Sequence, residues 1–217
     1  NEAIIIYKKT IKLYPHSPYA YSNIGRVLKE KEKLDEAEEY LRKAIHLKSN
    51  YEDAFLNLGI VLNEQCRYYE AAFYTKKAVN IRANFIQAHV SLSNIFYNLG
   101  DLIKAEEHAR KAIRIDVNNA KAHRNLSHVL IKKKQFTEGW KEYEWRWKVK
   151  DRKFKIGEKL QTSKPEWKSG AKGRIFLWAE QGIGDQILFS TLVPDLLKSV
   201  DELVIKIDQR LIPLYKR

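Results

Sequence analysis

The chain of 217 residues is 44% hydrophobic, which is enough apolar material for a sizeable buried core and argues against a disordered chain. Its single cysteine, Cys66, excludes a disulfide framework, and no apolar run approaches the ~18 residues that a membrane-spanning helix needs. Most of the net charge of +13 lies between residues 121 and 174. No RNP-like aromatic motif, zinc-ligand spacing or recognition helix accompanies this charge, so a nucleic-acid partner is not favoured.

These features predict a cytoplasmic protein without a membrane span. The sequence begins at Asn1, contains no Met and shows no signal-peptide pattern, so we expect it to be part of a longer protein. Scattered histidines and one cysteine do not form a metal-binding pattern, and we expect neither a metal nor a cofactor in this chain.

The first part of the chain repeats with a period of 34 residues. Three sets of small residues recur at this spacing: Gly25, Gly59, Ser93 and Ser127; Ala37, Ala71, Ala105 and Gly139; and Ala44, Ala78 and Ala112. A large apolar residue precedes each member of the first set, at Ile24, Leu58, Leu92 and Leu126. Small residues at a fixed period are expected where two paired helices approach closely, so each unit is predicted to be a helix–turn–helix.

Helix-start signals agree with this interpretation. Ser17 followed by Pro18 is typical of an N-cap and the first helical residue. Asp35 with Glu38 three residues later predicts the N-cap of the second helix, as a variant of the capping box.

This pattern resembles the tetratricopeptide repeat (TPR), in register over residues 18–51, 52–85, 86–119 and 120–153, with half of an earlier repeat in residues 1–17. The resemblance implies a mainly α protein in which residues 1–153 form an α-solenoid, a right-handed superhelix of helix–turn–helix repeats. It also implies that the first helices line a concave groove that binds a protein or peptide.

The resemblance places one set of asparagines, Asn23, Asn57 and Asn125, at a groove-facing register, where their amides can pair with a peptide backbone. Five basic residues occupy further groove positions and favour an acidic partner: Arg26, Lys29, Lys121, Arg124 and Lys132. The alternative is that asparagine at this register is partly structural. His89 and His123 have the spacing of core aromatic residues, which favours packed side chains over metal ligands.

The period ends near residue 150. The segment GWKEYEWRWKVK (139–150) predicts a last helix whose aromatic stripe, Trp140, Tyr143 and Trp147, packs in a core or interface. Residues 154–173 are predicted to form a basic, irregular connector.

In residues 174–217 the sequence pattern changes from helical repeats to alternating strands and helices. An apolar strand (174–180), a helix (185–199) that Pro194 kinks or divides, and a second strand (201–208) predict a partial, Rossmann-like βαβ unit at the start of an incomplete α/β domain.

The loop Gln181–Gln186 between the first strand and the helix has three interpretations. As a dinucleotide fingerprint it has Gly182 and Gly184 but Ile187 at the third glycine position, although Asp208 suits a ribose contact. Asp185 is expected to cap the helix, and its charge would repel phosphate. From the loop alone, a simple tight turn is favoured.

The third interpretation rests on context. The repeats, then GWKEYEWRW, PEWKSG and EQGIGDQILF, resemble a bacterial family of TPR proteins with a GT-B glycosyltransferase-like (heptosyltransferase-like) C-terminal domain. The resemblance implies that Asp185 is the general base and that acceptor hydroxyls are bound by Glu180, Gln181, Gly182, Gly184 and Gln186.

By the same resemblance the parent protein transfers a sugar from a nucleotide-sugar donor, which only the full-length parent would bind. This chain, without the donor-binding domain, is then expected to be inactive. The alternative is a non-enzymatic TPR interaction scaffold with a structural α/β tail.

Overall fold

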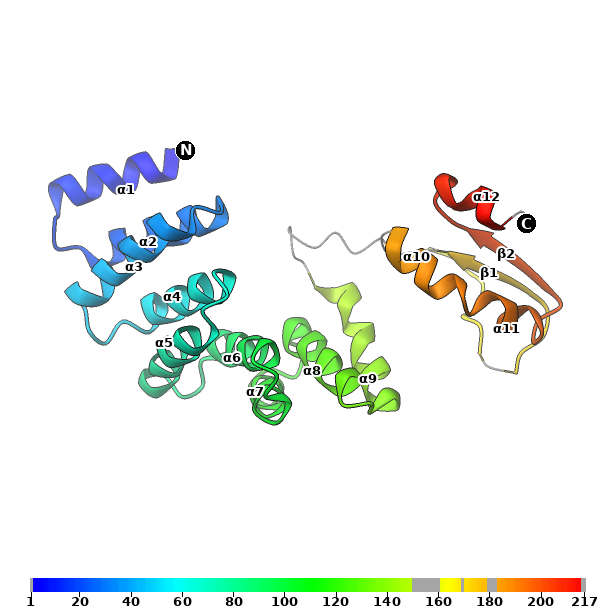
Figure 1. Ribbon diagram of the computed structural model, residues 1–217. Helices are drawn as coiled ribbons and strands as arrows, with labels where there is room; N and C mark the ends of the chain where they lie inside the picture. The colour runs from blue at the N-terminus through cyan, green and yellow to red at the C-terminus, as the bar shows by residue number, and fades with distance from the viewer. Residues whose placement is uncertain (1, 150–160, 169, 179–182, 216–217) are drawn as a thin grey trace. The chain divides into compact units, whose positions relative to one another are not determined.

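A computed structural model describes residues 2–149, 161–168, 170–178 and 183–215, and among the last of these it leaves the side chains of 183–185 and 214–215 undescribed. The chain divides into two compact units, Asn1–Val149 and Lys150–Arg217. Figure 1 shows that helices alone build the first unit, whereas the second contains two strands and short helices.

The first unit is a series of antiparallel helix pairs. Its helices are α1 (Glu2–Leu13), α2 (Pro18–Glu30), α3 (Leu34–Leu47), α4 (Glu52–Glu64), α5 (Tyr68–Ile81), α6 (Ile86–Asn98), α7 (Leu102–Ile115), α8 (Ala120–Lys132) and α9 (Phe136–Tyr143). The 34-residue period therefore maps onto the pairs α2/α3, α4/α5, α6/α7 and α8/α9, with α1 as the second helix of an earlier pair.

Helix starts agree with the sequence in one case and differ in the other. The Ser17 side chain caps α2 by accepting from the Ala20 N–H at 3.4 Å, with Pro18 as the first helical residue. The predicted N-cap at Asp35 is wrong: α3 begins at Leu34, after Lys33, and no side chain caps it. Asp35 instead lies in the first turn, where its charge favours the helix dipole.

The small residues set the distance between paired helices. A Cβ added to Gly59 on α4 would lie 2.0 Å from Thr75 Oγ1 on α5 and 3.1 Å from the Ala71 carbonyl oxygen. A Cβ at Gly25 would meet Leu41 Cγ at 2.6 Å. The paired helices therefore approach so closely at Gly25 and Gly59 that a neighbouring side chain would have to shift to admit a Cβ, whereas Ser93 and Ser127 fit a small side chain at the same register.

The turn inside each pair has a left-handed residue at the same register. Glu32, Cys66, Gly100 and Lys134 have φ angles of 61°, 62°, 80° and 62°. In the second pair, the Arg67 N–H donates to the Leu62 carbonyl and the Cys66 N–H to that of Asn63, which is the Schellman arrangement of a helix C-terminus. The other three turns have the same two hydrogen bonds, yet glycine occupies the position only at Gly100.

Replacing Cys66 by glycine is expected to stabilise the protein by about 0.5–1 kcal/mol, because glycine adopts φ near +60° without the steric cost that a Cβ imposes. Chemical denaturation of the full chain measures this change. Gln65→Gly is the matched control, since Gln65 has φ of −82° and gains nothing from glycine. A Cys66→Gly protein no more stable than the wild type would contradict the expectation.

The side on which the first helices lie is the concave side of this unit. The first helices α2, α4, α6 and α8 each contact their counterpart in the next pair, and these contacts are more extensive than those between second helices. An array in which one row of helices lies closer together must curve toward that row. We call the surface formed by the exposed sides of these four helices the concave groove.

The second unit contains the strands β1 (Arg174–Trp178) and β2 (Glu202–Lys206), which pair in parallel with Arg174 opposite Glu202. The helices α10 (Ile183–Ser190) and α11 (Val193–Leu197) connect them, and η2 (Gln209–Leu211) and α12 (Ile212–Tyr215) follow. This is the expected strand–helix–strand order, and the predicted division near Pro194 is confirmed, since Pro194 lies in the first turn of α11. Two strands do not establish a Rossmann-like unit, which remains a prediction.

Two details of this unit differ from expectation. The helix begins at Ile183, so Asp185 lies within its first turn and is not the N-cap. The second strand is also shorter than predicted, Glu202–Lys206 in place of 201–208, while residues 179–180 of the first predicted strand lie outside the described residues.

Candidate functional site

The predicted asparagine register lies on the concave groove, but its members differ. Asn23 on α2 and Asn57 on α4 are half-buried, and within the described part of the chain neither amide has a hydrogen-bond partner. Asn125 on α8 is buried, and its Nδ2 donates to the Val90 carbonyl on α6 at 3.0 Å. Asn125 therefore joins two successive first helices, and its groove role is less supported than that of Asn23 and Asn57.

A second group of amides on the groove was missed by the sequence interpretation. The Asn63 side chain on α4 donates to Asn94 Oδ1 and accepts from Asn98 Nδ2, both at 3.1 Å. Asn94 and Asn98 are one turn apart on α6, so the three exposed amides form a polar strip across two repeats. These three asparagines do not recur at the 34-residue period, so no sequence pattern predicted that they would bond to one another.

The predicted basic residues are only partly available to a ligand. Arg26 pairs with Glu30 on its own helix at 3.2 Å, and Lys132 Nζ lies 4.5 Å from the centre of the Tyr97 ring. Lys121 and Arg124 also have interactions within the chain, and Lys29 is half-buried. Since intramolecular partners reduce the free positive charge of the groove, its preference for an acidic ligand remains a prediction.

The histidines at the aromatic register are packed, as predicted. His89 is fully buried, with Nε2 at 3.0 Å from the Ala83 carbonyl and Nδ1 at 3.0 Å from Nδ1 of His108. Because a carbonyl only accepts, His89 Nε2 carries a proton, and in the neutral pair His89 Nδ1 accepts from His108. Burial lowers the pKa of both rings, that of His108 to about 4, where the neighbouring His89 adds to the effect.

The end of the last repeat differs from the predicted aromatic stripe. The helix α9 ends at Tyr143, and a tighter 3-10 turn, η1 (Glu144–Lys148), follows. This change of winding moves Trp145 onto the buried His123, with stacked rings 3.9 Å apart, while Glu142 pairs with the same His123 ring. Trp140, expected in a core or at an interface, is 50% exposed.

The predicted acceptor site lies largely outside the described residues. Glu180, Gln181 and Gly182 are outside them, and so are the side chains at Gly184 and Asp185 on α10. Gln186 is described: its Oε1 accepts the backbone N–H of Asp208 at 2.9 Å, so it ties α10 to the end of β2.

Asp208, the candidate ribose contact, already has a cationic partner. Its two carboxylate oxygens each accept from the Arg210 guanidinium at 2.9 Å, which lowers the pKa of Asp208 to about 2. A carboxylate engaged in this two-point contact is poorly placed to bind a ribose hydroxyl, so the dinucleotide interpretation loses its main support.

Comparison with known proteins bears on the helical unit. A family model described as tetratricopeptide repeat matches residues 18–51 and 86–119. The helical unit has the tetratricopeptide repeat fold. A comparison with curated proteins gives no match.

Solved structures of other tetratricopeptide proteins are similar to the chain. A MamA structure from Desulfovibrio magneticus RS-1 gives a TM-score of 0.60 at 20% identity, covering 66% of this chain and 81% of that one. YrrB, described as a TPR protein with an unusual peptide-binding site, gives 0.55 at 23% identity, covering 68% and 76%. PilF of Pseudomonas aeruginosa gives 0.59 at 21% identity, covering 65% and 64%. Identities this low establish the fold alone.

The comparisons thus establish the tetratricopeptide fold of the helical unit and give no support to a glycosyltransferase-like tail, since the family model matches no residue after 119. Among the described residues, none of the tetratricopeptide or α/β helices is both long and apolar enough to cross a bilayer. The same residues contain no group of three or more histidine, cysteine or carboxylate side chains that could hold a metal ion.

Proposed function

We propose that the chain is an interaction scaffold whose concave groove holds an extended peptide segment of another protein. The observation that carries this proposal is the pair of amides at Asn23 and Asn57, which occupy the same register of successive first helices and have no partner in the described residues. A half-buried amide without a protein partner can hydrogen-bond a ligand that offers a complementary group.

The chemistry of an amide fits a peptide backbone. Each side chain offers one acceptor and two donors, so it can bind a backbone N–H and C=O together without reading the ligand's side chains. The strip formed by Asn63, Asn94 and Asn98 supports the same class of ligand, because it continues the polar lining along the groove. Preference between sequences would then depend on the groove's charged residues.

The double variant Asn23→Ala/Asn57→Ala is expected to weaken peptide binding about tenfold or more, since each lost hydrogen bond contributes about 1 kcal/mol. The probe is a set of fluorescein-labelled dodecapeptides, selected on the wild-type chain from a random array and measured by fluorescence anisotropy. The matched control is Asn80→Ala, which removes an exposed amide from α5, a second helix. Unchanged affinity of the double variant for every selected peptide would remove the two asparagines from the groove function.

A glycosyltransferase-like parent protein remains the second candidate, with less support. What favours it is the parallel strand–helix–strand connection, which such a domain requires at its start. Its test is sugar transfer from a nucleotide-sugar by the full-length parent with Asp185→Asn. Transfer at the wild-type rate would exclude Asp185 as the general base, and no transfer by the wild type would leave the scaffold function alone.

A further inference from the structure

The second helices of neighbouring repeats are bridged by ion pairs at two junctions. Between α3 and α5, Glu38 accepts from Arg42 and from Arg67, both at 2.7 Å. The pKa of Glu38 is lowered, because the hydrogen bonds from the arginines outweigh its burial. The Glu38 carboxylate thus lies between α3 and α5, and the two arginines balance its charge.

The junction between α7 and α9 has the same arrangement. Glu106, 68 positions after Glu38, accepts from Arg110 at 2.8 Å and from Lys133 at 2.5 Å. Arg110 also reaches Glu138 on α9 at 2.9 Å. Of the three junctions from α3 to α9, two therefore carry a glutamate at one register and an arginine one turn later, whereas α1 has Ile4 and Lys8 at these registers.

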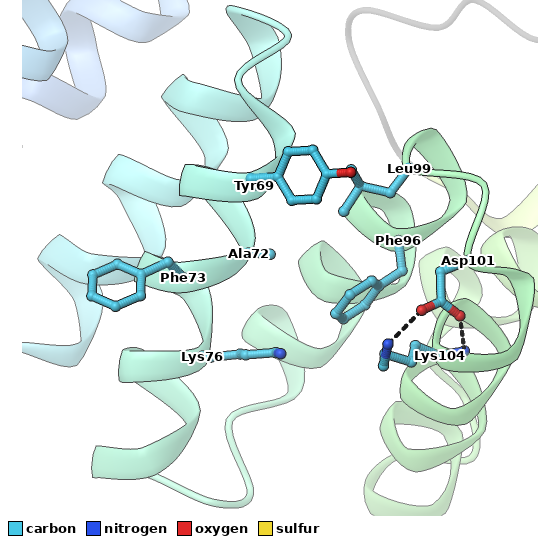
Figure 2. Close-up of a pocket in the computed structure, with 8 residues that line it drawn as sticks. All are labelled: Tyr69, Ala72, Phe73, Lys76, Phe96, Leu99, Asp101 and Lys104. Carbon is cyan, nitrogen blue, oxygen red and sulfur yellow. Dashed lines mark hydrogen bonds and ion pairs between the residues drawn. The ribbon is translucent and has the colours of Figure 1, made fainter.

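The middle junction, between α5 and α7, lacks the glutamate. Ala72 occupies its register, midway between Glu38 and Glu106, and Lys76 occupies the register of Arg42 and Arg110. A cleft of about 410 Å³ lies at this place, and Figure 2 shows the eight residues that line it: Tyr69, Ala72, Phe73, Lys76, Phe96, Leu99, Asp101 and Lys104. Ala72 therefore leaves space where the other two junctions have a glutamate, and the carboxylate that lines the cleft is Asp101, at the register of Arg67.

The lining of the cleft combines the aromatic ring of Phe96 with the side chains of two lysines, Lys76 and Lys104. Figure 2 shows Lys76 and Lys104 approaching the Phe96 ring from α5 and α7, and their ammonium nitrogens lie 5.3 Å and 5.5 Å from its centre. Lys104 is paired with Asp101 at 2.6 Å, so these two charges cancel. Lys76 forms no ion pair with any described residue.

We propose that this cleft is a second binding site, for an acidic segment of a partner protein. A carboxylate of the partner takes the place that Glu38 and Glu106 hold at the other junctions and pairs with Lys76. An apolar side chain beside that carboxylate lies against Phe96 and Tyr69, a residue that is 83% exposed. The cleft is lined by α5, by Phe96 and Leu99 at the end of α6 and by the start of α7. None of the predicted groove asparagines or groove cations lines it, so the scaffold can hold two segments at once.

The test uses the full 217-residue chain and a fluorescein-labelled hexapeptide, acetyl-Ser-Glu-Phe-Glu-Ser-Glu-amide, followed by anisotropy. Lys76→Glu reverses the unpaired charge, and we expect it to weaken binding about tenfold. Ala72→Glu restores the carboxylate of the other two junctions, so the protein should fold normally and lose binding through an internal pair with Lys76. Tyr69→Ala should weaken binding about threefold through lost apolar contact.

Lys43→Glu, the same charge change on α3, and Asn23→Ala/Asn57→Ala in the groove are the controls, and both should leave this affinity within twofold. Replacing the glutamates of the hexapeptide by glutamines should weaken binding to the wild-type chain. The proposal is overturned if Lys76→Glu and Ala72→Glu both bind as the wild type does, or if a benzoylphenylalanine version of the peptide cross-links to α2 or α4 beside Asn23 or Asn57. A loss caused only by the groove variant would assign the acidic peptide to the proposed groove function.

Discussion

Gly59→Ala is expected to destabilise the protein by about 3 kcal/mol, the largest effect we expect from a single methyl group in this chain. The added Cβ would lie 2.0 Å from Thr75 Oγ1, and that hydroxyl is held by donation to the Ala71 carbonyl at 2.8 Å. Thr75 is fully buried, so it has no free volume into which to rotate. The helices α4 and α5 must therefore move apart, which outweighs the ~1 kcal/mol that alanine gains over glycine in a helix. Urea unfolding of the full chain measures the loss.

A second substitution separates this clash from other causes. In the third repeat the equivalent pair is Ser93 facing Ala109, both buried, so a small residue on the second helix leaves room for a side chain on the first. Gly59→Ala/Thr75→Ala should therefore recover to within about 1 kcal/mol of the wild type. Strictly additive losses in the double variant would show that the close approach of α4 and α5 is not the cause.

The stability of the array is expected to fall as the pH is lowered from about 6.5 to about 4, because of the buried His89–His108 pair. The folded state holds the pKa of His108 at about 4, below its value of 6.5 in the absence of burial, so the unfolded chain binds more protons between these values. The contribution of the neutral pair is fully present above pH 6.5 and is lost as the pH falls toward 4. Urea midpoints measured over this range test the expectation.

His108→Gln is the informative variant, since the glutamine amide can still donate to His89 Nδ1 but does not titrate. Its stability should change less than that of the wild type between pH 6.5 and 4. His16→Gln, which replaces an exposed histidine, is the control and should follow the wild type. Equal pH dependence in all three proteins would show that the pair does not control acid sensitivity.

The fold of the first unit was largely predictable because its contacts repeat. Gly25 and Gly59 mark where paired helices touch, and the period alone located the helix pairs. Helix starts were less predictable. Asp35 has the side chain of a typical N-cap, but the N-cap position of α3 is occupied by Lys33 and the helix begins at Leu34. The left-handed turns at Cys66 and Lys134 were missed because glycine, the usual signal, occupies that register only at Gly100.

The groove asparagines were predicted from their shared position in the repeat, and the structure shows that their hydrogen bonding differs. Asn23, Asn57 and Asn125 are equivalent in sequence, yet only Asn125 meets a carbonyl of the preceding repeat. The contact of Trp145 with His123 was missed because the predicted helical stripe continued to Trp147, whereas α9 ends at Tyr143 and a 3-10 turn follows. Neither difference can be predicted from the residues of one helix, since each depends on a contact with an atom or ring of a neighbouring helix.

The sequence by itself determined the period, the helix pairing and the class change at residue 174, because these follow from spacing within one unit. Only the tertiary structure decided which amides are free, that His89 faces His108, and that Ala72 leaves a cleft beside Lys76. These features involve atoms from different helices, and their energies depend on distances of a few ångströms that no residue pattern specifies.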